Sequence, residues 1–388
     1  MRRVTLVPSE IELVLGEPED IARDRVLARV KTYVEIETPS RNETAIQQLA
    51  NLVARDLEAA GGNVEIAAAP GYGAQVIAHF AGETNDAHLV LLAHMDTVHP
   101  VGTIRTQPFL VKEDRAEGPG IYDMKTGFTL AIEALNLLKR KGAKPRRPVR
   151  IVLTCDEEIG TKASLATIEA NARGAAAVLV PEPCNKGGHA KTQRKGVLTY
   201  RLDVTGRAAH AGVAPQTGVN AIIEIGKQIE RLYSFAKPEL GTTVNVGVIS
   251  GGTASNVVAA NATAEIDVRI INMEEWKRID AAFMAIKPIT EGAQVVMSQS
   301  EQRPPLERTP AVVELYEKAR ALAAQLGHDM GEGLSGGGSD GSLTAAMGIP
   351  TLDGLGPDGG GAHAADEHIL IADLSYRLAL FTRIFETF

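Results

Sequence analysis

The chain has little of several residue types that mark specialised protein classes. Among its 388 residues are only two cysteines, which do not indicate a secreted disulfide scaffold. No apolar run reaches the length of a membrane span, and the first 16 residues mix Arg2, Arg3, Glu10 and Glu12 with apolar residues instead of forming the apolar centre of a signal peptide. We therefore expect a cytoplasmic protein without a membrane partner, although a leader peptide that had already been removed would leave no trace in this sequence.

Clustered positive charge is also absent. The formal net charge is −8, and the densest basic segment, residues 139–147, is typical of a solvated helix end and the loop after it. Nucleic acid is therefore not an expected partner. The 44% of hydrophobic and 23% of charged residues are ordinary for a globular protein, and the length predicts two or three domains or one large domain with an insertion.

The order of the periodic patterns predicts an α/β domain. Apolar residues recur at helical spacing in two stretches over residues 21–62 and again over Gly127–Lys141. Short aliphatic runs bounded by turn residues predict buried strands between and after these helices, at His88–Ala93, Val149–Cys155 and Ala177–Val180. Strands that alternate with helices are typical of an α/β sheet.

The pattern changes near Lys195 and changes back after residue 302. Strict alternation puts Tyr200, Leu202 and Val204 on one strand face, and the same holds for Val244, Val246 and Val248 and for the segment Ala264–Ile270. An amphipathic helix is expected over residues 219–236, with an apolar stripe of Ile222, Ile225, Ile229, Leu232 and Tyr233. These patterns predict an α+β domain at residues 195–302, inserted between the two parts of the α/β domain at 1–194 and 303–388.

Histidine and acidic residues follow the predicted α/β strands at the point where each strand ends. They are His94 and Asp96 after the first strand, Glu157 and Glu158 after the second, and Glu182 after the third. Ligands of open α/β sheets bind outside the carboxyl ends of the strands, so these side chains should share one rim. Asp123, in a glycine-bearing loop before a helix, and His363, in the late loop 359–363, are placed to join them.

The joint pattern predicts a metal site, although each feature alone is weak. A lone His-x-Asp or Glu-Glu pair is more often surface polarity, but converging carboxylates repel one another and a divalent cation neutralises them. Imidazole and carboxylate without thiolate suit zinc, with cobalt or manganese as substitutes. Five candidate ligands are too many for one tetrahedral ion, whereas two ions that share a carboxylate use them all.

Five motifs in order along nearly the whole chain resemble the M20 family of metallopeptidases, most closely its glutamate carboxypeptidase branch. They are the segments 94–98, 120–125, 156–160 and 182–183 and the late His363. The resemblance implies a mixed-sheet, zinc-exopeptidase-like catalytic domain, and it makes the insert a ferredoxin-like dimerisation or lid domain. We therefore expect a homodimer.

The resemblance also implies roles for the motif residues. Asp123 would bridge two divalent metal ions, His94 and Glu182 would complete one site, and Glu158 and His363 the other. Asp96 would orient the imidazole of His94. Glu157 would act as the general base that takes a proton from the attacking water and delivers it to the leaving nitrogen. A cis peptide bond would follow Asp123.

The predicted insert and the loop after it contribute further candidates. From the residues alone, His210 is a turn histidine and Arg269 one half of a cross-strand ion pair. The resemblance instead implies that His210 stabilises the oxyanion in a partner subunit's site. It makes Arg269, assisted by Asn256, a clamp for the substrate carboxylate. Gly337 and Gly338 precede a short helix and would bind substrate through backbone N–H groups.

Three functions remain open at this point. The resemblance favours release of a C-terminal amino acid, with glutamate as a candidate, from a small peptide or N-acyl conjugate. An N-acyl-amino-acid deacylase (aminoacylase) or a di- or tripeptidase would use the same chemistry on another substrate. A metal-binding protein without catalysis is disfavoured by Glu157, because a protein that only binds metal needs no base. The remaining histidines, at positions 79, 88, 99, 189, 328 and 368, have no expected role beyond surface or packing positions.

Overall fold

The computed structural model describes residues 8–388, so Arg2 and Arg3 lie outside the described part of the chain. The chain divides into two compact units. Unit 1 runs up to Thr192 and includes Arg308–Leu334 and Ser339–Phe388, and unit 2 comprises Gln193–Glu307 and Ser335–Gly338. The segment 335–338 belongs to unit 2 although it follows a stretch of unit 1 in the sequence. The sequence patterns did not predict that residues 335–338 belong to unit 2.

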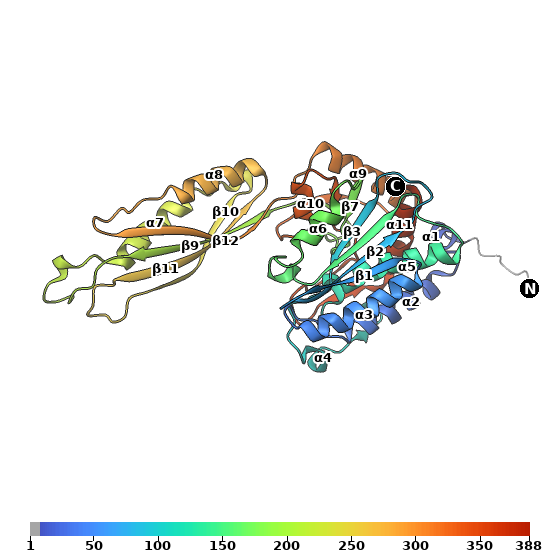
Figure 1. Ribbon diagram of the computed structural model, residues 1–388, viewed down its shortest axis with the longest axis horizontal. Helices are drawn as coiled ribbons and strands as arrows, with labels where there is room; N and C mark the ends of the chain where they lie inside the picture. The colour runs from blue at the N-terminus through green and yellow to red at the C-terminus, as the bar shows by residue number, and fades with distance from the viewer. Residues whose placement is uncertain (1–7) are drawn as a thin grey trace, which may run out of the picture. The chain divides into compact units, whose positions relative to one another are not determined.

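Unit 1 is built on a six-stranded mixed sheet in the order β1-β2-β6-β3-β7-β14 (Figure 1). The strands β6, β3, β7 and β14 run parallel, whereas the hairpin β1-β2 joins β6 in the antiparallel direction. This arrangement confirms the expected α/β class with a mixed sheet. The strand bounds are Asn63–Ala69 for β1, Gly73–Phe80 for β2, Leu89–His94 for β3, Val149–Thr154 for β6, Ala177–Leu179 for β7 and Thr351–Leu352 for β14.

Helices cover both faces of this sheet (Figure 1). The helix α3 begins at its cap Asn42, whose side chain accepts from Ala45 N, and it packs on β1 and β2. A short helix α1, closed by a capping box between Ser9 and Glu12, was not expected from the sequence. The helices are α1 Glu10–Leu15, α2 Glu19–Val34, α3 Glu43–Ala59, α4 Thr103–Thr106, α5 Thr126–Arg140, α6 Leu165–Ala172, α9 Pro310–Gln325, α10 Gly341–Ala346 and α11 Leu374–Thr387.

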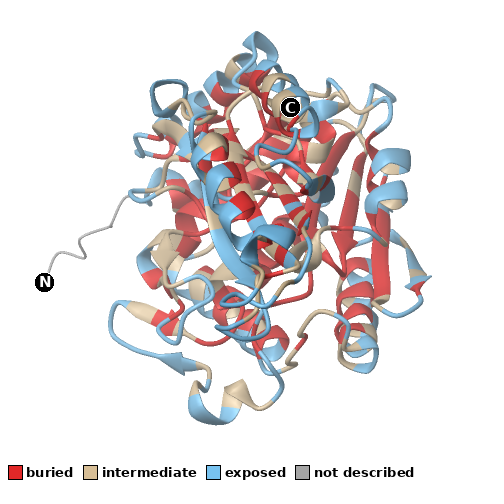
Figure 2. Cartoon of the chain, turned by 90° about the vertical axis from the view of Figure 1, so that its left-hand side faces the viewer, coloured by how far each residue is buried: buried red, intermediate tan, exposed pale blue. Residues whose placement is uncertain are grey.

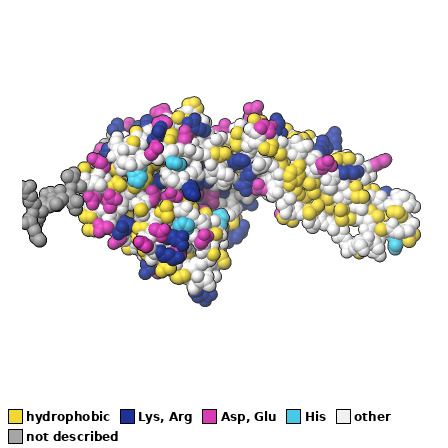
Figure 3. Space-filling model, turned by 180° about the vertical axis from the view of Figure 1, so that it is seen from behind, with side chains coloured by type: hydrophobic (Ala, Val, Ile, Leu, Met, Phe, Trp, Pro, Cys, Tyr) yellow, Lys and Arg dark blue, Asp and Glu magenta, His cyan; other side chains and the backbone are white. Residues whose placement is uncertain are grey.

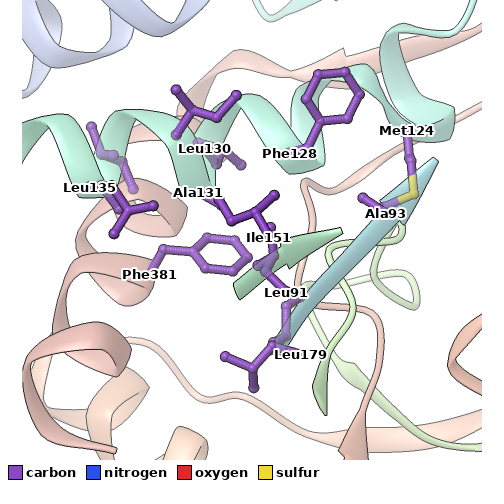
Figure 4. Close-up of a cluster of buried hydrophobic side chains, with 14 of the residues drawn as sticks. Leu91, Ala93, Met124, Phe128, Leu130, Ala131, Leu135, Ile151, Leu179 and Phe381 are labelled. Carbon is purple, nitrogen blue, oxygen red and sulfur yellow. The ribbon is translucent and has the colours of Figure 1, made fainter. Parts of the chain in front are cut away.

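The main core of unit 1 lies between the sheet and helices α5 and α11. Figure 4 shows Leu91, Ile151 and Leu179 of the parallel strands facing Ala131 of α5 and Phe381 of α11. These strands are buried along almost their whole length, which is why they appear in the sequence as continuous aliphatic runs. The same layering is visible as buried strands and inward helix faces in Figure 2.

Two small sheets are present beside the six-stranded sheet, one within unit 1 and one made of strands that run from one unit into the other. Strands β15 (Gly359–Gly360), β16 (His368–Leu370), β5 (Arg115–Glu117) and β4 (Leu110–Val111) are neighbours in that order. The pairing of β16 with β5 brings the late loop 361–367 beside the segment that precedes Asp123. The pair β8 (Ala190–Arg194) and β13 (Glu332–Ser335) forms the other sheet.

Unit 2 is an α+β unit with a four-stranded antiparallel sheet in the order β10-β11-β9-β12. Its core consists of the inward residues of the sheet and of two helices (Figure 1). The bounds are β9 Gly196–Thr205, α7 Ala221–Tyr233, β10 Thr243–Gly251, β11 Asn261–Ile270, α8 Met273–Met284 and β12 Gln294–Arg303. The alternation expected for β9 and β11 is confirmed, since Tyr200, Leu202 and Val204 are buried.

Two expectations within unit 2 were wrong. The register of β10 shifts between Val246 and Val248, so this bulge turns Val248 outward and leaves it 54% exposed. On α7, Ile222 and Tyr233 are exposed, while Glu224 is buried and accepts hydrogen bonds from the backbone N–H groups of residues 289 and 290. The apolar stripe therefore identified the inward face only in part, since Ile225 and Leu232 are buried, and Glu224 joins them because a distant segment supplies the partners that allow a carboxylate to be buried.

Among the helices of residues 8–388, none is long and apolar enough to cross a membrane.

Candidate metal centre

The carboxyl ends of neighbouring parallel strands bring the first predicted ligands together. Strand β3 ends at His94, and β6 and β7, its two neighbours in the sheet, lead to the turn Glu157–Ile159 and to Glu182. His94 is 2% exposed and its Nε2 lies 3.4 Å from Glu182 Oε1. The rim expected from the sequence is therefore present in unit 1.

Asp123 enters this rim from a tight segment just before α5. Its backbone follows Gly120, which has a φ of 71°, and a cis peptide bond joins it to Met124. Met124 lies beside Ala93 under the sheet end (Figure 4), and its sulfur accepts the backbone N–H of His94 at 3.4 Å. Buried packing of Met124 therefore ties the Asp123 segment to the end of β3.

Asp123 lies between two imidazoles and faces each with a different oxygen. Its Oδ1 is 3.1 Å from His94 Nε2, and its Oδ2 is 3.4 Å from His363 Nε2. The second imidazole is also 3.2 Å from Glu158 Oε2. The five side chains thus form two groups that share Asp123, one with His94 and Glu182 and the other with His363 and Glu158.

His363 is held in a loop conformation that few residues adopt. Its φ is 64°, in the left-handed region that costs a residue with a Cβ about 1–2 kcal/mol. Its side chain is 52% exposed, whereas Glu158 beside it is 7% exposed. Backbone strain at a residue of this kind is typical of functional loops.

The electrostatics of this cluster are those of a site that requires cations. Hydrogen bonds with Asp123 and Glu158 raise the pKa of His363 to about 10. Burial raises the pKa of Glu158, and its Oε1 is buried without a hydrogen-bond partner. A carboxylate oxygen that no protein donor satisfies fits a metal ligand, because a buried charge needs a compensating one.

The chemistry of the candidate ligand atoms indicates which metal ions the site would bind. Two imidazole nitrogens and three carboxylates, with Asp123 presenting one oxygen to each half, suit divalent ions of the zinc, cobalt and manganese type. His94, Asp123 and Glu158 each offer one ligand atom, and the three atoms lie within 4.8 Å of one another. The residues present therefore fit a metal site.

Asp96 supports this cluster in a way that the motif alone does not specify. The Nδ1 of His94 lies 2.9 Å from the backbone carbonyl oxygen of Asp96, and 3.6 Å from its carboxylate. That carboxylate accepts the hydroxyl of Ser40 and the backbone N–H groups of Glu157 and Glu158. Asp96 therefore connects the end of β3 with the turn that carries both glutamates, and Glu157 is half-buried on this turn.

Sequence reasoning missed two residues beside the cluster. His99, expected to have only a surface or packing position, is buried, and its Nε2 lies 2.5 Å from Glu367 Oε2. Glu367 is 2% exposed and accepts the backbone N–H of Asp123. The sequence offered one signal for Glu367, its position four residues after His363. A single Glu in a polar loop is common, so this position alone predicts no role.

The predicted residues of the insert lie at two separate places in unit 2. His210 is exposed, and the backbone of Asn256 pairs with it through Ala211 N–H to Asn256 O at 2.9 Å. Arg269 lies at the far end of β11, which begins at Asn261. Eight residues of extended strand span roughly 27 Å and separate Arg269 from the start of β11, and the assistance of Arg269 by Asn256 stays a prediction.

The glycine loop presents carbonyl groups to arginines. The guanidinium of Arg194 donates to Gly337 O at 3.3 Å and to Gly338 O at 2.7 Å, and Arg269 Nη1 donates to Gly336 O at 3.5 Å. The helix that follows, α10, begins only at Gly341 and has six residues. The contact between the glycine loop and Arg269 is therefore made by a backbone carbonyl oxygen of the loop.

A mixed α/β sheet that delivers two imidazoles and three carboxylates to one rim is an arrangement that fits the class of metal-dependent hydrolases. Residues 90–387 match the model of peptidase family M20/M25/M40, and the chain belongs to this family. It is 30% identical to carboxypeptidase G2 of Pseudomonas sp. over an alignment of 391 positions, which covers 98% of this chain and 93% of that protein.

Solved structures share the fold. The aminopeptidase PepT from Bacillus cereus superposes with a TM-score of 0.77 at 22% identity and covers 93% of this chain and 98% of its own. A tripeptidase from Staphylococcus aureus gives 0.76 at 24% identity, with 94% and 98% covered. These likenesses show that 93–94% of the chain shares the fold of these two peptidases.

Proposed function

We propose that this protein is a two-metal exopeptidase that releases a C-terminal amino acid from a small peptide or an N-acyl conjugate. The observation that carries the proposal is Asp123, which faces one imidazole with each of its oxygens, beside a turn with the adjacent acids Glu157 and Glu158. The 30% identity to carboxypeptidase G2 supports cleavage at the C-terminal end of the substrate, with glutamate as the candidate released residue.

The residues divide the chemistry among them. His94 and Glu182 would hold one divalent ion and His363 and Glu158 the other, with Asp123 shared. When bound, such ions act as Lewis acids toward a carbonyl oxygen and lower the pKa of water. Glu157, on the same turn as a ligand but not itself one, would take the proton of the attacking water and deliver it to the leaving nitrogen.

Arg269 is proposed to bind the free carboxylate of the substrate. Its Nε and Nη2 are each 2.9 Å from one oxygen of Asp267, which fixes the plane of the guanidinium. The Nη1 group points to Gly336 O at 3.5 Å, so the glycine loop lies on the side of the guanidinium that Asp267 does not occupy. A substrate carboxylate would approach there, because a planar fork binds carboxylate with two parallel hydrogen bonds.

A second copy of this chain is the proposed partner of unit 2. Strand β10 is an edge strand of the sheet, and exposed apolar residues lie on it and on α7. They are Val248, Ile249, Ile222 and Ile223. Figure 3 shows hydrophobic side chains gathered on one face of this unit, among few charges. An unpaired apolar edge favours strand addition by an identical copy.

A substrate panel with the variant Glu157→Gln tests the proposed function. Metal-loaded protein should release free glutamate from acyl- or aryl-glutamates, and Glu157→Gln should retain both metals while losing about 10²–10⁴-fold in kcat. Released amino acid and metal content are measured on the same samples. A near-normal rate in the variant would remove Glu157 from the mechanism, and one tightly held ion per chain would contradict the two-metal site.

Two other functions correspond to other outcomes of the same panel. Release of acetate or succinate would indicate an N-acyl-amino-acid deacylase, and cleavage of di- or tripeptides from the amino end would indicate a peptidase like the aminopeptidase and tripeptidase that share the fold. Absence of hydrolysis across dipeptides and N-acyl amino acids would favour a metal-binding protein without catalysis.

A further inference from the structure

Glu367 is a buried carboxylate that contacts three of the segments carrying the predicted metal ligands. We propose that Glu367 is a positioning residue that sets the distance between Asp123 and His363 and links both to the segment after His94. It touches neither substrate nor metal in this proposal, and it acts through the backbone of its neighbours. The proposal deepens the proposed function, because it rests on the same two-metal site.

The contacts of Glu367 concentrate on one short segment. Its Oε1 accepts the backbone N–H groups of Tyr122 at 2.8 Å and of Asp123 at 3.0 Å. Its Oε2 accepts the backbone N–H of Gly120 at 3.0 Å and lies 2.5 Å from His99 Nε2. Three backbone N–H groups of the segment 120–123 are therefore oriented by one side chain that stands 244 residues beyond Asp123.

The same residue closes the loop that presents His363. Strands β15 and β16 pair through Gly360 and His368, and Glu367 is the last residue of the loop between them. Its backbone carbonyl accepts Gly118 N–H at 3.3 Å, and its N–H donates to Ala364 O at 3.4 Å. The backbone of Glu367 thus belongs to the His363 loop while its side chain holds the Asp123 segment.

His99 adds the third segment. It lies five residues after His94 in the loop that leaves β3, and it is buried against Glu367. The carboxylate therefore meets the loops of His94, Asp123 and His363, whereas Glu158 and Glu182 are supported elsewhere. Partners outside the ligands of a metal site commonly fix their orientation in this way.

An amide cannot replace this carboxylate. Oε1 of Glu367 accepts two backbone N–H groups, and Oε2 accepts one backbone N–H group and contacts the imidazole of His99, so a glutamine in either orientation would direct its NH₂ group at a backbone N–H group and leave at least one of them unsatisfied. Aspartate would be shorter by one methylene and would not reach these four partners together. Glu367→Gln is nearly isosteric and keeps the packing, which makes it the informative variant.

Glu224 offers a matched control in unit 2. It is a buried glutamate that also accepts two backbone N–H groups, from Ile289 at 2.9 Å and Thr290 at 2.7 Å, and it contacts no predicted ligand segment. Glu224→Gln should lower thermal stability without changing metal binding. If Glu367 contributed only to general stability, Glu367→Gln and Glu224→Gln would have the same effect on metal binding.

The experiment measures metal loss from the full-length, zinc-loaded chain under a chelator, together with thermal unfolding. In Glu367→Gln we expect metal affinity to fall about 10–100-fold and at least one ion to dissociate correspondingly faster. His99→Ala leaves the three backbone donors in place, so its metal affinity should lie between those of wild type and Glu367→Gln. Glu224→Gln should release metal at the wild-type rate.

The outcomes separate this proposal from the proposed function. If wild-type protein binds two ions and Glu367→Gln releases them at the wild-type rate, Glu367 has no positioning role although the metal site stands. If Glu367→Gln and Glu224→Gln lose metal equally, the effect is global and the proposal is wrong. Wild-type protein that binds no ions would contradict the two-metal function and the proposal together.

Discussion

Arg269 and Asp267 form a bidentate pair two residues apart on β11, with both N–O distances at 2.9 Å. The guanidinium is about one-third exposed, so this ion pair contributes little to stability. The pair instead orients the side chain of Arg269, because it fixes the plane of the guanidinium with Nη1 directed at the glycine loop. A related pair, Arg201 with Asp203 on β9, in which Nε lies 3.0 and 3.1 Å from the two carboxylate oxygens, serves as its comparison.

Arg269→Lys should weaken substrates that carry a free carboxylate. A lysine is a point charge and cannot form two parallel hydrogen bonds, and a hydrogen bond to a charged group is worth about 1.5–3 kcal/mol. We expect kcat/KM to fall about 10–100-fold for such substrates and to stay unchanged for the same compounds amidated at that carboxylate. Steady-state kinetics on both series check this, and Arg201→Lys should match wild type on each.

At the scale of elements, the close approach of α5 to the chain after β7 holds two ligand segments together. Helix α5 begins directly after the Asp123 segment, and a Cβ on Gly127 would stand 1.9 Å from the carbonyl oxygen of Pro181, next to Glu182. Only glycine permits this approach, because any side chain would overlap a backbone atom. The contact thus couples the position of Glu182 to the first turn of α5.

Gly127→Ala should therefore reduce both stability and metal affinity. Overpacking against backbone costs about 1–3 kcal/mol, and relief requires the helix or the Pro181 segment to move. Urea unfolding should give a lower free energy of unfolding, and chelator competition should show weaker metal binding. Unchanged stability would mean that the two segments separate freely and that the close contact has no structural role.

The start of α8 in unit 2 provides a pH-dependent contribution to stability. Hydrogen bonds from Arg278, aided by Thr242, lower the pKa of Glu275 from 4.5 to about 2. A folded-state pKa below the unfolded one stabilises the fold above about pH 4.5, and this contribution disappears as the pH falls through 2. The stability difference between wild type and Glu275→Gln should accordingly shrink over that interval, as measured by thermal unfolding at each pH. A difference that is constant with pH would exclude this ion pair as its source.

At the scale of the whole molecule, the predicted functional residues are divided between the two units. The five predicted ligands and Glu157 belong to unit 1, and His210, Asn256 and Arg269 belong to unit 2. Within unit 2, the His210–Asn256 pair and Arg269 lie at opposite ends of β11. If both ends act on one substrate, they come from different subunits, which favours the dimer proposed for the β10 and α7 face.

Mixing two inactive variants tests sharing between subunits. His210→Ala should lose activity, and mixed with Glu157→Gln it should recover part of the rate, because some mixed dimers then contain one intact site. Activity after co-refolding is the measurement, with each variant mixed with itself as the control. Sedimentation should show dimers for all samples, and dimers without recovered activity would contradict a role for His210 across the interface.

Much of the fold and of the site could be predicted from the sequence, because both depend on local patterns and on motif order. Buried parallel strands are continuous aliphatic runs, so β3, β6 and β7 were predicted within one residue at each end, and the residues that follow them converge on one rim. The burial of Glu224 on α7 and the outward turn of Val248 were not predicted, because a distant hydrogen-bond partner and a bulge decide them.

The sequence by itself determined the family, the parallel strands β3, β6 and β7 and the set of predicted ligands. Only the tertiary structure decided that Asp123 faces both imidazoles, that the backbone carbonyl of Asp96 rather than its carboxylate lies closest to His94, and that Glu367 reaches three loops. The physical reason is distance along the chain. Periodicity and strand ends are encoded within a few residues, whereas a hydrogen bond between residues 120 and 367 spans 247 positions and has no local signal.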